Sequence, residues 1–234
     1  TVGRFRRYAI IPISGDQVTA GPMARPVTDA AILLGELESA SPDPNDAVTT
    51  LCQVPANGDY TTFLNLDGLQ GARIGIPRAL YYDSIQVPGT NRWQSRMNEE
   101  SRAVMADAIA ILETQGAIVV DPADIPSVID TDPATSLVTN GGSSVLNYGM
   151  KRDFNAWLAT LGETAPVKTL TELREWNLAH RSMGAIKYEQ ARLDGADAID
   201  LEADRAQYEA DLMQDNVLNA TRGIDAAMTE HELD

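Results

Sequence analysis

Hydrophobic and polar residues follow different periods along the chain, and each period predicts a kind of element. Apolar positions recur every three or four residues in 27–37 and 99–115, which is the spacing of amphipathic helices. Residues 71–77 and 117–120 carry short apolar runs bounded by glycine or proline, which predict strands buried on both faces. The order strand, helix, strand therefore predicts a βαβ unit with parallel strands and a right-handed crossover.

The rest of the chain is predicted as loops followed by helices. Residues 39–65 are rich in Pro, Asp, Asn, Gly and Thr, and 123–142 are similar, so both are predicted as loops. From about residue 148 the pattern predicts helices around 153–160, 169–193 and 201–221. The fold class that follows is α/β with a helical C-terminal part.

Composition and charge narrow the range of partners. The 234 residues carry 18 Lys and Arg against 34 Asp and Glu, which gives a net charge of -16. Such a surface repels phosphate backbones and anionic lipids, so we expect neither nucleic acid nor a membrane as a partner. Residues 1–7 are basic but lack a following apolar core, so we do not expect them to be a signal peptide. Because the first residue is Thr1 rather than Met, we expect a piece of a longer protein.

Candidate metal ligands and cofactor motifs are few. The one cysteine, Cys52, has no partner for an internal disulfide, and two histidines make a His-based metal site or a Ser-His-Asp triad improbable. The sequence holds neither a phosphate-binding glycine loop nor a dinucleotide fingerprint, so no cofactor is expected. We interpret one acidic cluster as a solvated helix start rather than a cation site: Asp197, Asp200, Glu202 and Asp204.

Residues 14–19, S-G-D-Q-V-T, form a polar turn between an apolar run at 9–13 and the predicted helix at 27–37. A polar turn at a strand end above a parallel sheet is a common place for a ligand. Alternatively, Asp16 and Thr19 only satisfy the backbone groups of the turn itself. The residues alone leave both interpretations open.

A second candidate is the run from Gly141 to Ser144, which is followed by Lys151. A serine beside a neutral, desolvated lysine is a competent nucleophile. However, this run ends a predicted loop directly before a helix, with Lys151 expected to be exposed. We therefore favour a flexible loop and helix capping over catalysis.

Several motifs together resemble the amidase signature family. Its members typically read G-I-I-P-I-S-x-x-Q-D-T-A-G-P-M-A-R-T-V-x-D-A-A where residues 9–31 read A-I-I-P-I-S-G-D-Q-V-T-A-G-P-M-A-R-P-V-T-D-A-A. Residues 71–78, G-A-R-I-G-I-P-R, resemble its G-x-R-I-G-V-P-R strand, and 148–158, Y-G-M-K-R-D-F-N-A-W-L, are similar to its Y-E-F-K-x-D-L-N-A-Y-L helix. The likeness extends through G-I-D-A-A at 223–227 and is greatest to the peptide-amidase-like branch, rather than to the amidase component of tRNA-dependent amidotransferases.

The resemblance implies a mixed central sheet flanked by helices, with residues 1–234 as a partial amidase domain cut at both ends. The family hydrolyses linear carboxamides with a Ser–cis-Ser–Lys triad. In the family's sequence the triad residues come before the position that Thr1 matches. The resemblance therefore assigns no catalytic residue to this chain. The implied partners are a small-molecule or peptide amide and the missing N-terminal half. An alternative is a non-catalytic amidase-like scaffold or binding module.

Gln17 is the one residue to which the resemblance assigns substrate binding. It matches the glutamine of the Q-D-T-x-G-P turn, which borders the acyl side of the cleft, and its carboxamide can both donate and accept a hydrogen bond. Alternatively, it bonds only to the backbone of the turn. The chain departs from the family pattern at Ala9, Val18, Pro26 and Glu189.

Overall fold

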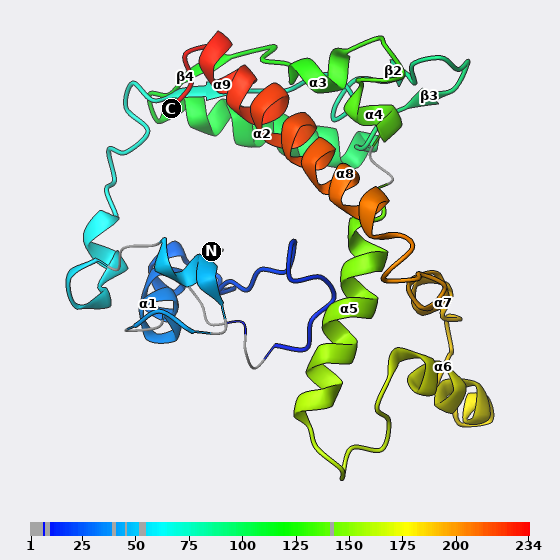
Figure 1. Cartoon of the computed structure of the whole chain (residues 1–234). Coiled ribbons are helices and arrows are strands. Elements are labelled where there is room, and N and C mark those ends of the chain that lie inside the picture. Colours follow the sequence, from blue (N-terminus) through cyan, green and yellow to red (C-terminus); the bar gives the residue numbers. More distant parts are fainter. Residues whose placement is uncertain (1–6, 8–9, 39–40, 45, 52–54, 141–142) are drawn as a thin grey trace. The chain divides into compact units, whose positions relative to one another are not determined.

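The computed structural model describes residues 7, 10–38, 41–44, 46–51, 55–140 and 143–234 (Figure 1). Ala9, Cys52, Gly141 and Gly142, which entered the predictions above, lie outside this set. The chain divides into two compact units, and each is described by itself. Unit 1 comprises Thr1–Leu64 and Ser144–Tyr208, and unit 2 comprises Asn65–Ser143 and Glu209–Asp234.

The βαβ prediction for unit 2 is confirmed in its pairing. Strands β1 (Arg73–Gly75) and β4 (Ile118–Val120) are parallel, and helix α2 (Glu99–Thr114) lies between them in the chain. The Asn98 side chain accepts a hydrogen bond from the N–H of Ser101 at the start of α2, as an N-cap does. Each strand is only partly buried, contrary to the sequence prediction. The handedness of the crossover stays a prediction.

Unit 2 also holds short elements that the sequence pattern did not reveal. Strands β2 (Ile85–Gln86) and β3 (Trp93–Gln94) form an antiparallel pair. Helices α3 (Pro126–Ile129) and α4 (Leu137–Asn140) lie in the segment predicted as a loop. Helices of four residues are shorter than two turns and cannot establish a hydrophobic period, so the prediction was wrong there.

The helix predicted at 201–221 is divided between two elements, α8 (Arg205–Asn216) and a π-helical stretch, η5 (Val217–Ile224). Helix α9 (Asp225–Glu230) follows beyond the predicted end. The Ser127 hydroxyl of α3 donates to the carbonyl of Leu218 in η5 at 2.7 Å.

Unit 1 is helical. It contains α1 (Val27–Leu37), α5 (Val145–Thr160), α6 (Leu170–Ala179) and α7 (Ala191–Asp197), together with short 3-10 helices at Ala47–Thr50, Ala56–Gly58, Tyr60–Phe63 and Arg181–Met183. A core cluster of Phe154, Leu158, Leu170 and Ala196 joins α5, α6 and α7. Within the segment predicted as a surface loop, Asp43, Asp46 and Thr49 are buried, contrary to that prediction.

The predicted helix at 169–193 is wrong, because α6 ends at Ala179 and α7 begins only at Ala191. Gly184 and Glu189 have φ angles of 85° and 63°, which are left-handed values that an α-helix does not tolerate.

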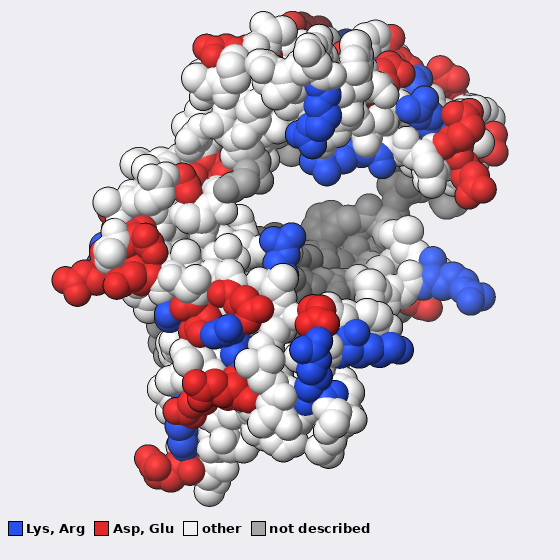
Figure 2. Space-filling model, turned by 90° about the vertical axis from the view of Figure 1, so that its right-hand side faces the viewer, with Lys and Arg blue, Asp and Glu red and all other residues white. Residues whose placement is uncertain are grey.

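Within the described residues, no helix is both long and apolar enough to cross a membrane. On the face that Figure 2 shows, acidic and basic side chains lie next to one another in several places.

Candidate functional site

The polar turn of unit 1 is packed directly against helix α5. The backbone N–H groups of Gln17 and Val18 donate to the Ser14 carbonyl at 3.0 and 2.8 Å, which closes the turn. Ser14 is fully buried. Gly149 of α5 lies so close that a Cβ there would overlap the Ser14 hydroxyl. Position 149 therefore needs glycine for close approach between helix and turn.

The backbone of the turn is held by two charged residues. The Gly15 N–H donates to Asp153 Oδ2 of α5 at 2.5 Å. Arg7 Nη1 donates to the carbonyls of Gly15 and Val18 at 2.5 and 3.1 Å. Hydrogen bonds between Arg7 and Asp46, at 2.6 and 2.7 Å, raise the pKa of Arg7 and lower that of Asp46.

The Asp16 side chain is held by residues far away in sequence. Its Oδ2 accepts from the Tyr208 hydroxyl of α8 at 2.8 Å and from Arg152 Nη2 of α5 at 3.1 Å. The Ser14 hydroxyl lies 3.4 Å from the same oxygen. Asp16 therefore does more than satisfy the backbone of the turn, and that interpretation is wrong for this residue. The Thr19 hydroxyl, in contrast, donates to the adjacent Ala20 carbonyl at 3.5 Å.

The two donors to this cluster, Arg152 and Tyr208, both have a raised pKa. Hydrogen bonds from Arg152 to Asp153 are the main cause of a raised pKa of the guanidinium. Burial, which disfavours the phenolate, raises the pKa of Tyr208. The phenol therefore retains the proton that it donates to Asp16. Arg152, Asp153 and Tyr208 were missed by sequence reasoning, which noted Arg152 and Asp153 only as letters of a motif.

Gln17 is exposed at the centre of this held segment. Among the residues that the structure describes, its side chain makes no hydrogen bond, so the alternative of a glutamine bonded to the backbone finds no support. Its expected place on a concave surface stays a prediction.

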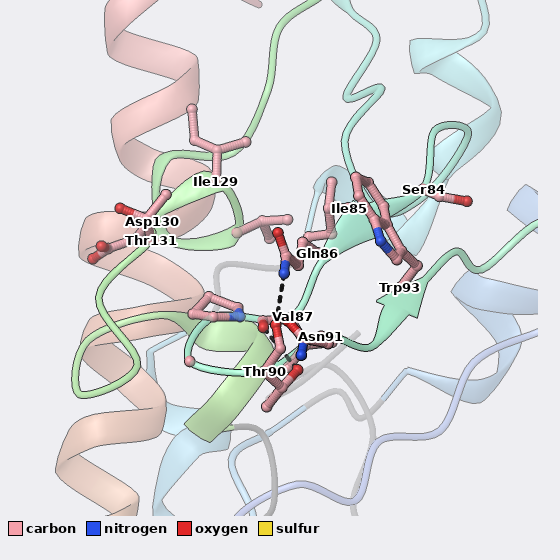
Figure 3. Close-up of a pocket in the computed structure, with 13 residues that line it drawn as sticks. Ser84, Ile85, Gln86, Val87, Thr90, Asn91, Trp93, Ile129, Asp130 and Thr131 are labelled. Atoms are coloured by element: carbon pink, nitrogen blue, oxygen red, sulfur yellow. Dashed lines mark hydrogen bonds between the residues drawn. The ribbon is translucent and has the colours of Figure 1, made fainter.

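A cavity of about 650 Å³ lies in unit 2, between the β2–β3 hairpin and the end of α3 (Figure 3). This volume is typical of small-molecule sites. The Trp93 indole and the Gln86 carboxamide line it from the hairpin, and Ile129, Asp130 and Thr131 from the other segment. The sequence analysis assigned no role to these residues.

The serine–lysine candidate is not assembled as a catalytic pair. Lys151 is partly buried rather than exposed, and its ammonium donates to the Asp197 carbonyl at 2.5 Å and lies 3.6 Å from Asp197 Oδ1. The Ser144 side chain does not cap α5, which corrects the predicted capping. The Ser143 hydroxyl donates to Asp215 at 2.7 Å.

The prediction of a solvated helix start is wrong for Asp197 but fits Asp200 and Glu202, which are exposed in the turn directly before α8. Asp197 accepts hydrogen bonds from Thr171 and Arg174 at 2.7 and 2.5 Å, and its side chain is only 8% exposed. Asp200 accepts from the N–H groups of Glu202 and Ala203. Among the described residues, no group of three or more His, Cys, Asp or Glu could hold a metal ion.

Comparison with known proteins identifies the family. The family model described as Amidase matches residues 1–231. The chain belongs to the amidase family. The native peptide amidase of Stenotrophomonas maltophilia superposes on this amidase-family chain with a TM-score of 0.77 and 32% sequence identity, over 100% of this chain and 42% of that chain. The peptide amidase PAM in complex with the competitive inhibitor chymostatin gives a TM-score of 0.78, again with 32% identity and the same coverage.

Curated relatives match about half of this amidase-family chain. A putative amidase of Arthroderma benhamiae is 35% identical over 127 residues, which are 54% of this chain and 19% of the relative. A glutamyl-tRNA(Gln) amidotransferase subunit from Trichlorobacter lovleyi is 35% identical over 117 residues, or 50% and 20%. The matched segment thus spans about a fifth of these relatives. The likeness to peptide amidases over the whole chain confirms the peptide-amidase-like branch.

Proposed function

We propose that this chain forms part of the substrate cleft of an amidase that hydrolyses linear carbon–nitrogen amide bonds of peptides or small molecules. The Ser–cis-Ser–Lys triad of that enzyme lies outside residues 1–234. The observation that carries the proposal is the exposed Gln17 in a turn whose neighbouring residues are all hydrogen-bonded. Family membership supports the reaction class.

Gln17 has the chemistry that an amide substrate requires. The carboxamide offers N–H donors and a carbonyl acceptor, which complement the carbonyl and the N–H of a substrate amide. Because the turn is already held by Arg7, Asp153 and Asp16, little further ordering is needed when substrate binds. Gln17 would therefore orient the acyl side while the triad attacks the carbonyl and protonates the leaving amine.

The net charge of -16 supports a further part of the proposal, that neither nucleic acid nor a membrane surface is a partner. The partner proposed instead, besides the amide substrate, is the N-terminal half of the amidase domain.

The decisive experiment supplies that N-terminal half from a known enzyme. In a chimera, residues 1–234 replace the matching 42% of the Stenotrophomonas maltophilia peptide amidase, with the unaltered amidase as a control. We expect the folded chimera to hydrolyse a peptide amide and to lose all turnover when the donor's nucleophilic serine is changed to alanine. A chimera that has the circular dichroism and monomeric size of the control but no turnover would favour the non-catalytic scaffold.

A further inference from the structure

We propose that Tyr208 and Arg152 are positioning residues, which fix the turn at 14–18 and thereby aim the carboxamide of Gln17. This inference rests on the proposed function, because it names the residues that prepare Gln17 for substrate. Neither residue is assigned contact with the substrate.

The first argument is the convergence of two helices on one carboxylate. Asp16 precedes Gln17 directly, and its Oδ2 accepts from Tyr208 and from Arg152, which are 192 and 136 positions away in the chain. The turn is thus held in two ways next to Gln17: through the carboxylate of Asp16 and through the backbone of Gly15. Such anchoring restricts the directions in which the Gln17 side chain can leave the turn.

The second argument is that the Tyr208 hydroxyl has one defined orientation. It accepts from Arg152 Nη1 at 2.8 Å, so its single O–H is left to donate to Asp16, also at 2.8 Å. The Tyr208 ring stacks on that of Tyr148, with centroids 4.1 Å apart and planes 10° apart. The Arg152 guanidinium lies 5.3 Å from the ring centroid, within reach of a cation–π interaction.

The third argument is the geometry of the Arg152 guanidinium. Its Nε and Nη2 donate to the two oxygens of Asp153 at 2.6 and 2.9 Å, while Nη1 donates to Tyr208. The same Asp153 accepts the Gly15 N–H. The planar guanidinium of Arg152 therefore links Asp153, which holds the backbone of the turn, with Tyr208, which holds the Asp16 side chain.

The chain supplies a matched control in the same stacked pair. The Tyr148 hydroxyl donates to the Leu201 carbonyl at 2.7 Å rather than to the turn. Tyr148→Phe and Tyr208→Phe each remove the phenolic hydroxyl of a buried residue and keep the ring. Only Tyr208→Phe removes a hydrogen bond to Asp16.

The first test uses the full chain of 234 residues and needs no catalysis. Amide NMR follows hydrogen exchange of the Gly15 N–H and the side-chain NH₂ signals of Gln17, which Gln17→Ala assigns. We expect Tyr208→Phe to shift the Gln17 signals and to accelerate Gly15 exchange at least fivefold. Tyr148→Phe should leave both unchanged. Equal behaviour of the two variants, or no change in either, would overturn the inference.

The second test is a double-mutant cycle in the active chimera. If Tyr208 acts through Gln17, Tyr208→Phe should lower kcat/KM about fivefold, mainly through KM, and should have no further effect in a Gln17→Ala background. Multiplicative effects of the two substitutions would instead show that Tyr208 acts without Gln17 and would contradict the inference.

The two tests separate this inference from the proposed function. If Gln17→Ala leaves turnover unchanged while NMR shows the expected difference between the tyrosine variants, Gln17 is positioned but does not bind substrate, and the proposed role of Gln17 fails. Should Tyr208→Phe unfold the chain, Asp16→Asn serves in its place, because it keeps the size of the side chain and removes the charge that Arg152 pairs with.

Discussion

At the scale of single residues, Gln17 is the side chain of this chain to which we assign substrate binding, so its removal should lower kcat/KM. We expect Gln17→Ala in the active chimera to lower kcat/KM about tenfold, the cost of one hydrogen bond of about 1.4 kcal/mol. The loss should appear mainly in KM, because Gln17 is proposed to act on the binding of the substrate and not on the chemical step. Steady-state kinetics with a peptide amide provide the measurement.

The control for that prediction is Gln115→Ala. Gln115 is also exposed and follows helix α2 in unit 2. Its removal should change kcat/KM less than twofold. A Gln17 variant as active as the Gln115 variant would reduce Gln17 to a residue of the turn.

Gly149 leads to a prediction of stability rather than activity. Glycine to alanine within a helix normally stabilises by about 1 kcal/mol. At Gly149, however, the new Cβ would overlap the Ser14 hydroxyl, and such overpacking costs about 1–3 kcal/mol. We therefore expect Gly149→Ala to lower the Tm by several degrees, measured by calorimetry.

Gly195 of α7 gives the matched comparison. A Cβ there would lie 3.5 Å from the nearest atom, the Asn147 Nδ2, which is an ordinary contact. Gly195→Ala should leave the Tm unchanged or raise it. A rise in Tm for both variants would mean that α5 and the turn are not in close contact.

At the scale of elements, Asp197 joins three helices of unit 1. It lies at the end of α7 and accepts hydrogen bonds from Thr171 and Arg174 of α6, and Lys151 of α5 pairs with it. Burial acts to raise the pKa of Asp197, but these hydrogen bonds and positive charges outweigh it and hold the pKa below its ordinary value.

This shift predicts how stability depends on pH. A carboxyl whose folded-state pKa is lowered binds its proton more readily when unfolded, so its contribution is complete above about pH 5 and is lost as the pH falls through the folded-state pKa. We expect Asp197→Asn to be less stable than the original chain at pH 7, with a difference that shrinks below about pH 4. Urea unfolding across this range of pH, from neutral to about pH 3, measures it.

Glu189→Gln is the control, because Glu189 pairs with Arg181 at the surface, where both side chains are at least 60% exposed. Such pairs contribute little to stability. This variant should match the original chain at every pH. A difference for Asp197→Asn that did not depend on pH would contradict an ionic role for Asp197.

The elements that the sequence predicted well are those whose signal is local. The helix at Glu99–Thr114 has its own apolar period, and the strands at Arg73–Gly75 and Ile118–Val120 are short apolar runs bounded by glycine or proline. The break between α6 and α7 was missed because Leu173, Trp176 and Ile186 continue a helical spacing through it. Left-handed backbone at Glu189 has no signal in its side chain.

Of the candidate site, only the turn at 14–19 and Gln17 could be predicted from the sequence. Polar residues between a strand-like run and a helix drew attention to the turn, and the resemblance selected Gln17. The partners of Asp16 on helices α5 and α8 are separated from it by more than 130 positions, so no local period can reveal them. Arg152 and Tyr208 would otherwise be interpreted as charged and aromatic residues of amphipathic helices.

At the scale of the whole molecule, the proposed function places substrate-binding residues in this chain and the catalytic triad outside it. This chain matches 42% of the peptide amidases that it resembles, and it contributes Gln17 and the residues that hold it. The nucleophile, its lysine base and the oxyanion donors are proposed to lie outside it. A hydrolase divided in this way should bind without reacting when one part is present alone.

We therefore expect the isolated chain to have no amidase activity. The one local substitute, Ser144 with Lys151, is not assembled, because the Lys151 ammonium is directed to the backbone and side chain of Asp197. A lysine engaged in this way is a poor general base for a serine hydroxyl. The assay incubates the purified chain with simple amides and amidated peptides, beside a Ser144→Ala variant and the active chimera. Both forms of the isolated chain should remain at the buffer background while the chimera turns over. Turnover by the isolated chain that disappears in Ser144→Ala would show that Ser144 is a nucleophile, and the proposed division of the enzyme would be wrong.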